Sequence, residues 1–115
     1  GIKAIGGNYS GNVINMTIRD SVSSGNGANG IVGTGTASGA VIVMMIDHST
    51  SSHNGGFGVI ADGPKTTIRM GNSSIAGNID GVGVSNGGVL QSYGTNRING
   101  NSSDGIASLT PIGLH

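Results

Sequence analysis

The sequence contains no cysteine, two prolines, 3% aromatic residues and 9% charged residues. The absence of cysteine excludes a disulfide framework and a metal site built from thiolates. The few charges balance, with five Lys and Arg against five Asp and Glu, so no basic surface points to nucleic acid or an anionic membrane. The longest apolar run, residues 40–46, is too short to span a bilayer. We therefore expect neither nucleic acid nor a membrane among the partners of this chain.

Glycine is abundant instead, with 24 residues in a chain of 115, and hydrophobic residues make up 35%. Dense glycine and the lack of an i, i+3, i+4 apolar pattern argue against helices. The Ile and Val content argues against disorder, because apolar surface is available for burial. The length suits one domain. These features favour an all-β domain whose core needs few large apolar side chains.

A repeat organises the chain. A glycine followed by a branched aliphatic residue occurs at Gly1, Gly30, Gly58, Gly81 and Gly105, with consecutive spacings of 29, 28, 23 and 24 residues. In addition, VINMTIRDSVSSGN (13–26) aligns without a gap on VIVMMIDHSTSSHN (41–54). A period of this length with several short strands per repeat predicts a solenoid. The turn-like Asn-Gly and Asp-Gly pairs are then not hairpins, since a hairpin would reverse the strand and break the repeat.

Aligned repeats predict which side chains face inward, because side chains alternate between the two faces of a strand. The predicted inward columns of the first strand are Ile18, Ile46, Met70 and Tyr93, and Met16, Met44, Ile68 and Gln91. The predicted outward column between them is Thr17, Met45, Arg69 and Ser92. The predicted inward column of another strand is Ile31, Val59, Val82 and Ile106. Ile75 can be aligned with either Val22 or Ser23.

Two segments, TIRMGNSSIAGNIDGVGV (67–84) and SYGTNRINGNSSDGIA (92–107), resemble the repeats of right-handed parallel β-helix proteins of the pectin-lyase-like family. The resemblance extends over residues 13–107. It implies an all-β, right-handed parallel β-helix of about four coils, in which asparagines stack at the turns. The matching columns are Asn26, Asn54, Asn78 and Asn101 and, less regularly, Asp20, His48, Asn72 and Thr95. Asparagine suits such turns because it tolerates left-handed backbone conformations.

The expected organisation is one domain, residues 1–115. Its coils are expected at residues 1–12 (partial), 13–40, 41–65, 66–89 and 90–108, with 109–115 as a cap or tail. In this scheme SSHNGGFGVIADG (51–63) is a turn followed by a core strand, and its glycines mainly serve backbone conformation. A phosphate-binding loop would instead need a helix after the strand.

The resemblance also implies polysaccharide as the ligand class, and a secreted or cell-surface bacterial protein of which this chain is the carboxyl-terminal part. The motifs that carry catalysis in the family, such as an Asp-Asp pair, Gly-His-Gly and Arg-Ile-Lys, are missing from this sequence. The remaining candidates for catalysis are Asp20, Asp47 and His48, since a carboxylate beside an imidazole can make an acid or base. Arg19 and His53 are candidate ligand-binding residues next to them.

The alternative for the same residues is a surface ladder in which Arg19 stacks on Asp47 and Asp20 on His48, which would contribute little energy. A metal site at Asp20, His48 and His53 would lack a further ligand at suitable spacing, so no metal and no cofactor are expected. Val43 and Met45 occupy outward positions that are polar in other repeats. They predict a contact surface, or a strand face covered by the turns of residues 33–40.

The ends of the stack suggest one further partner. Pro111 lies in an irregular stretch that would cap one end, whereas the amino-terminal repeat shows no cap, so we expect a homo-oligomer through the amino-terminal coil.

The function favoured by the sequence is a non-catalytic structural or saccharide-binding module of a longer secreted protein. The alternative is a fragment of a polysaccharide lyase or glycoside hydrolase. An ice-binding solenoid is disfavoured because the outward column holds no regular ladder of threonine.

Overall fold

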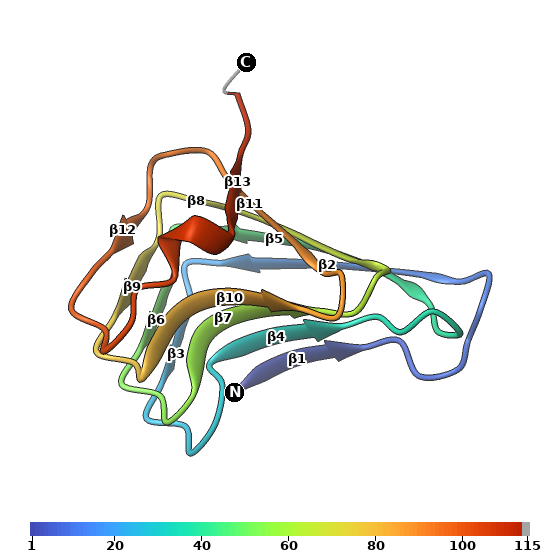
Figure 1. Cartoon of the computed structure of the whole chain (residues 1–115), viewed down its shortest axis with the longest axis horizontal. Helices are drawn as coiled ribbons and strands as arrows, with labels where there is room; N and C mark the ends of the chain where they lie inside the picture. Colours follow the sequence, from blue (N-terminus) through green and yellow to red (C-terminus); the bar gives the residue numbers. More distant parts are fainter. Residues whose placement is uncertain (114–115) are drawn as a thin grey trace.

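The computed structural model describes residues 1–113. The chain winds into a parallel β-solenoid of about four turns (Figure 1). Its elements in chain order are β1 (Ile2–Ile5), β2 (Val13–Arg19), β3 (Val22–Ser24), β4 (Ile31–Thr34), β5 (Val41–Asp47), β6 (Thr50–Ser52), β7 (Phe57–Asp62), β8 (Thr66–Gly71), β9 (Ser74–Ala76), β10 (Asp80–Ser85), β11 (Val89–Ser92), β12 (Arg97–Ile98), the 3-10 helix η1 (Ile106–Ser108) and β13 (Leu109–Pro111). Within the described part, no helix is long and apolar enough to cross a membrane.

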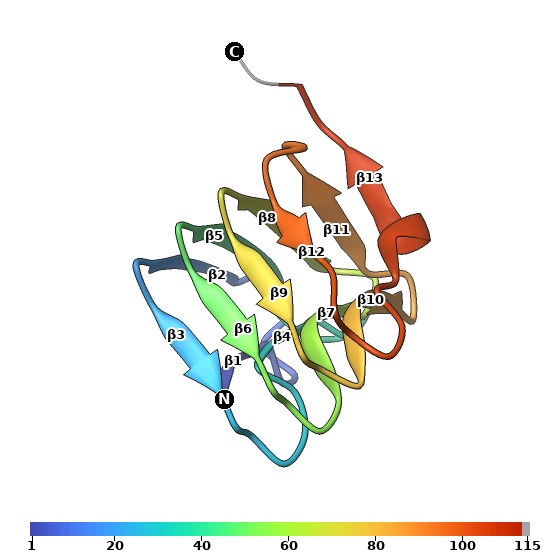
Figure 2. The same ribbon diagram turned by 90° about the vertical axis from the view of Figure 1, so that its left-hand side faces the viewer.

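The strands form three parallel sheets, one along each side of the solenoid. Sheet A has the order β1-β4-β7-β10, sheet B has β13-β11-β8-β5-β2, and sheet C has β12-β9-β6-β3. Figure 2 shows the strands of sheet C stacked side by side in coil order. Every strand pair is parallel, including those that follow Asn29-Gly30 and Asp80-Gly81. The predicted all-β solenoid is thus confirmed, and the turn-like dipeptides are not hairpins.

The core is a narrow column between the sheets. In the middle coils the inward residues of sheet B are fully buried, and β2 pairs with β5 without a gap, Met16 opposite Met44 and Ile18 opposite Ile46. Sheet A contributes Ile31 and Val59, which are opposite each other as predicted. Each coil buries only a few side chains, and stacking joins them into one core.

The predicted asparagine column is confirmed and is directional. The backbone N–H and the Nδ2 of Asn54 both donate to Oδ1 of Asn78, at 3.0 and 2.8 Å. Asn26 makes the same two bonds to Asn54, and Asn78 makes them to Asn101. Asn54 and Asn78 are buried, so these bonds satisfy polar groups that would otherwise be costly inside the turn.

The prediction for the glycines of residues 51–63 was wrong for most of them. Of Gly55, Gly56, Gly58 and Gly63, only Gly63 has a positive φ, 95°. Gly58 is required for space, because a Cβ at this position would lie 2.7 Å from Nδ2 of Asn78. The glycine that marks the repeat therefore keeps the asparagine column clear of side chains.

The predicted alignment of β11 was wrong by one residue. Leu90 and Ser92, rather than Gln91 and Tyr93, lie opposite Ile68 and Met70, so Gln91 joins the outward column next to Arg69. Residues that lie opposite each other are 22 positions apart at Met70 and Ser92, but 23 positions apart at Ser73 and Asn96 on the next corner. The added residue is accommodated after Ser92, where Gly94 has a φ of 80°. This register buries Leu90 completely, which explains why it is preferred.

Sheet C settles the alignment of Ile75. It lies opposite Ser51, which in turn lies opposite Ser23, so Ile75 belongs to the inward Ser23 column and is buried.

The last coil also departs from prediction. Ile106 is not an inward strand residue; it lies in η1 and is 56% exposed. The carbonyl of Asp104 still accepts a bond from Val82 N–H in sheet A, and the chain then enters η1. The side chain of Asp104 accepts hydrogen bonds from the N–H and Nδ2 of Asn101, at 3.2 and 3.0 Å, which ends the asparagine column. Residues 109–111, expected in a cap or tail, form β13 beside β11, where Leu109 packs against the core.

Candidate functional site

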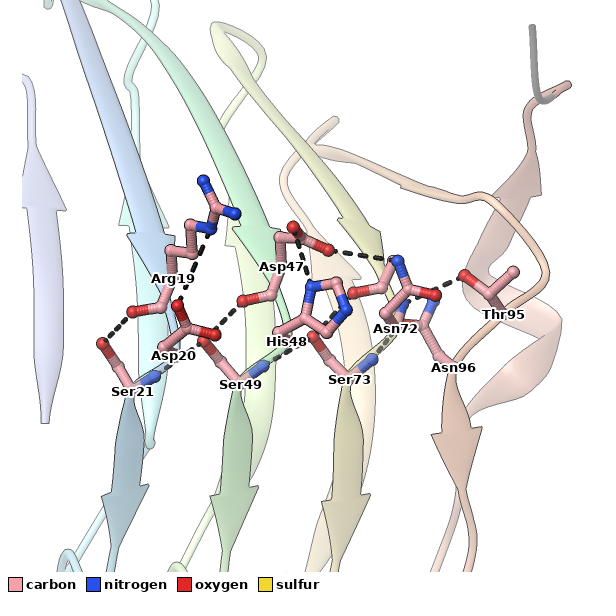
Figure 3. A network of polar contacts seen from close by, with 11 residues as sticks. Arg19, Asp20, Ser21, Asp47, His48, Ser49, Asn72, Ser73, Thr95 and Asn96 are labelled. Atoms are coloured by element: carbon pink, nitrogen blue, oxygen red, sulfur yellow. Dashed lines mark hydrogen bonds and ion pairs between the residues drawn. The ribbon is translucent and has the colours of Figure 1, made fainter.

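The corner between sheets B and C carries most of the polar side chains predicted to be functional (Figure 3). At this corner Asp20, His48 and Asn72 occupy equivalent positions and have φ values of 50°, 45° and 50°. Asp, Asn and His are the non-glycine residues that best tolerate this conformation. The sharp turn from one sheet to the next therefore explains the residue types in this column without any reference to function.

A second ladder supports the corner from inside. The N–H groups of Ser21 and Ser49 donate to the Oγ of the serine in the next coil, each at 3.2 Å, and Ser73 N–H donates to Oδ1 of Asn96 at 3.1 Å. Each serine hydroxyl donates to a carbonyl oxygen two residues earlier. These hydrogen bonds hold the backbone that carries the exposed side chains of the corner.

Asp47 is the best-connected carboxylate of this corner. Its Oδ2 lies 3.0 Å from Nδ1 of His48, and its Oδ1 accepts a bond from Nδ2 of Asn72 at 3.2 Å. The hydrogen bonds from His48 and Asn72 lower the pKa of Asp47 below its ordinary value. Asp47 is therefore ionised at neutral pH, which suits it to accept hydrogen bonds from a ligand and not to act as a general acid.

The pKa of Asp47 gives a direct test of this geometry. His48→Ala and Asn72→Ala should each raise it towards the ordinary value, and His48→Ala should do so more because its hydrogen bond is the larger cause. Since the folded-state pKa is lowered, the stability that this group contributes is present above the unfolded pKa and is lost as pH falls through the folded pKa. Carboxyl NMR titration measures both shifts. Asp62, whose pKa is lowered by Asn86 and Ser85, serves as the control that should not move.

A groove crosses this corner. One hollow of about 280 Å³ and another of about 260 Å³ adjoin each other and share Asn72 and Thr95 in their walls. The first continues past Ser73 and Ser74 to Arg97, and the second continues to Tyr93, Met45 and Asp47. The groove therefore places a guanidinium, an amide, hydroxyls and a carboxylate beside one aromatic ring and one thioether.

The predicted polar candidates are only partly brought together. Asp47 and His48 are in contact, whereas Arg19 pairs with Asp20 of its own coil, at 3.7 Å. Arg19 and Asp47 lie opposite each other in the sheet, as the repeat predicts, and Asp20 and His48 occupy equivalent positions of the turn. The ion pairs of the described residues nevertheless join sequence neighbours, Arg19 with Asp20 and Asp47 with His48. Asp47 also bonds to the next coil, through Nδ2 of Asn72.

His53 does not belong to this corner. It follows β6 at the next turn, where its ring lies near Gly77. Within residues 1–113 no group of three or more His, Asp or Glu side chains is arranged to hold a metal ion.

The two outward apolar residues lie on the outer face of sheet B and are partly exposed. Val43 is opposite Asn15 and Thr67, and Met45 is opposite Thr17 and Arg69. Met45 also lines the groove, so the predicted contact surface and the polar corner are adjacent.

Sequence reasoning missed Tyr93 and Arg97 as groove residues. Tyr93 was assigned to the core because of the one-residue error in β11. Arg97 occupies a position of sheet C that holds Ser74 and Thr50 in the preceding coils, and this single change of residue type was the available signal. Asn72 and Thr95 were recognised only as turn residues.

Comparison of the chain with protein-family models, with curated proteins and with solved structures finds no match. The assignment of a function therefore rests on the geometry of this corner.

Proposed function

We propose that this chain is a saccharide-binding β-solenoid module without catalysis of its own, and that it belongs to a secreted or cell-surface protein. The observation that carries the proposal is the composition of the corner groove. Sugars offer hydroxyls at their edges and C–H groups on their faces, so they suit a site with spaced hydrogen-bonding groups around an aromatic ring.

Each part of the groove has a role in this proposal. Asp47 accepts hydrogen bonds from sugar hydroxyls, Asn72 and Thr95 add amide and hydroxyl groups, and Tyr93 packs against the apolar face of a ring. Arg97 at the far end contributes a cation that can donate two bonds to a carboxylate or hydroxyl pair.

The proposal is tested by retention on insoluble polysaccharides and by calorimetry with soluble neutral and acidic oligosaccharides. Tyr93→Ala and Asp47→Asn should each weaken binding by about tenfold or more, because each removes roughly 1.4 kcal/mol or more of contact. Tyr9→Ala is the matched control, since Tyr9 is exposed outside the groove and should leave affinity unchanged. Absence of retention on every polymer would overturn the proposal.

Catalysis is the second candidate, favoured by the contact between Asp47 and His48. A carboxylate that holds Nδ1 of an imidazole leaves Nε2 as the nitrogen that exchanges a proton with a ligand. Release of reducing ends or unsaturated products, lost in both Asp47→Ala and His48→Ala, would identify a polysaccharide hydrolase or lyase. Retention without turnover supports the binding module.

A further inference from the structure

The outer face of sheet A carries a separate hollow, which shares no lining residue with the corner groove. Its volume is about 240 Å³, and it extends over the strands of sheet A, which lie side by side in Figure 1. The centre of the hollow lies on β4 and β7, and each of these strands is paired on both sides. The hollow therefore belongs to the side of the solenoid and not to one of its ends.

Two aliphatic side chains form the floor of this hollow. Val32 and Ile60 lie opposite each other, and each follows an inward residue, so both point outward. Each is nonetheless only 9% exposed, and neither belongs to the core between the sheets. On the β10 side the ring of Phe57 occupies the space that a Cβ at Gly83, the next residue of this column, would need. Neighbouring side chains thus enclose an apolar floor on the outer face of the sheet.

A carboxylate stands at the side of the floor where β7 ends. Oδ1 of Asp62 accepts hydrogen bonds from Oγ of Ser85 at 2.7 Å and from Nδ2 of Asn86 at 2.8 Å. The bond from Asn86 and then that from Ser85 lower the pKa of Asp62, so this group is ionised at neutral pH. Within residues 1–113 no Lys, Arg or His side chain pairs with it. Its charge is therefore oriented by neutral donors and has no cation as a partner.

Hydrogen-bond donors lie at the opposite side of the hollow, where the strands begin. Lys3 occupies the same outward column as Val32 and Ile60, and it takes part in no ion pair of the described residues. Oδ1 of Asn29 accepts a bond from the N–H of Phe57 at 2.9 Å, so the amide nitrogen of Asn29 remains as a donor. The hollow therefore has donors at one side and an ionised carboxylate at the other.

The two charges lie diagonally across the floor. Lys3 and Asp62 are separated by two coil steps of about 4.8 Å and two residue steps of about 3.3 Å, so their Cα atoms lie roughly 12 Å apart. A charge beside apolar surface loses hydration, and this loss is offset only when the charge has a partner. A ligand that carries both a cation and an anion supplies the two missing partners at once.

We propose that this hollow binds an amphoteric aliphatic molecule of amino-acid or dipeptide size. Its ammonium group bonds to Asp62, its carboxylate bonds to Lys3 and Asn29, and its apolar body lies on Val32 and Ile60. Hydrogen bonds between groups of opposite charge are stronger than neutral ones, so they fix the orientation of the ligand. The volume of about 240 Å³ is smaller than that of pockets for drug-sized ligands, which favours a small molecule.

NMR titration of the isotope-labelled 115-residue chain with four probes tests the proposal. The amphoteric probes are L-leucine and leucyl-leucine, isopentylamine carries the amine alone, and isovalerate carries the acid alone. We expect the amphoteric probes to shift the amide signals of Val32, Ile60 and Asp62. The tighter of the two should bind at least about tenfold more strongly than either single-charge probe, which lacks one charged hydrogen bond. The order of the two amphoteric probes gives the preferred size.

Two variants test the charged groups separately. Asp62→Asn and Lys3→Gln should each weaken binding of the tighter amphoteric probe by at least about tenfold. Asp62→Asn keeps an oxygen that can accept from Ser85 and Asn86, so its circular dichroism and melting temperature should match those of the parent. Lys65→Gln is the matched control, because Lys65 donates to the carbonyl oxygen of Gly39 outside the hollow and should leave affinity unchanged.

The proposal would be overturned if neither amphoteric probe bound, if isopentylamine or isovalerate bound as tightly as the amphoteric probes, or if affinity were unchanged in Asp62→Asn. Oligosaccharide binding that is lost in Asp62→Asn would also overturn it, in favour of a second saccharide site. The inference does not rest on the proposed function of the corner groove. Probe titration and retention on polysaccharides are separate measurements, so failure of one proposal is distinguishable from failure of the other.

Discussion

Asn54→Ala is expected to destabilise the chain by about 3–5 kcal/mol, the largest effect that we anticipate for a single side chain. Oδ1 of Asn54 accepts bonds from the N–H and Nδ2 of Asn26, and its Nδ2 donates to Oδ1 of Asn78 and Oγ of Ser51. Truncation leaves several of these groups buried without a partner, which costs more than the loss of the bonds themselves. Because the column runs through successive coils, the substitution also removes hydrogen-bond partners from Asn26 and Asn78 in the two adjacent coils.

Urea unfolding at a fixed protein concentration measures this effect. Asn15→Ala is the matched control, since Asn15 is exposed and its side chain makes no hydrogen bond within residues 1–113; its change should stay within about 0.5 kcal/mol. A loss of less than about 1 kcal/mol in Asn54→Ala would mean that water replaces the missing amide and that the column is not cooperative.

Gly58→Ala should cost about 2–3 kcal/mol, although it adds only one methyl group. The new Cβ would lie 2.5 Å from Cγ2 of Ile75, 2.7 Å from Nδ2 of Asn78 and 2.8 Å from the carbonyl oxygen of Gly81. Ile75 and Asn78 are buried and Gly81 contributes backbone, so relief requires movement of an adjacent coil. The penalty comes from crowding, since the φ of Gly58 is not positive.

Gly27→Ala is the matched control for this prediction. A Cβ at Gly27 meets no atom within 4 Å, and its φ is not positive. The substitution should be neutral or stabilise by up to about 1 kcal/mol, because alanine restricts the unfolded chain. Equal urea midpoints for Gly58→Ala and Gly27→Ala would show that the coils adapt to the added methyl group.

The sequence was sufficient for the fold because a solenoid repeats its contacts. Asn26, Asn54, Asn78 and Asn101 recur at coil spacing, and a parallel stack with any other register would break both this column and the Ile31 and Val59 column. Prediction was wrong where the repeat changes length, at Tyr93, and where it ends, at Ile106. One added residue reverses inward and outward positions, and a spacing pattern cannot locate that residue within a turn.

The site was less predictable than the fold. Asp47, His48 and Met45 were identified as candidates and do lie at one corner, because all three are close in sequence at the end of one strand. Tyr93 and Arg97 were missed, since they join the groove from another coil and only the correct register brings them there.

The sequence alone determined the coil spacing, the inward columns of the middle coils and the stacked asparagines, because identical positions in successive coils must meet. Only the tertiary structure decided the partners of the charged side chains, the register of β11 and the closure of the asparagine column by Asp104. These features depend on side-chain torsions and on where the chain departs from its repeat, and neither is encoded in a periodic pattern.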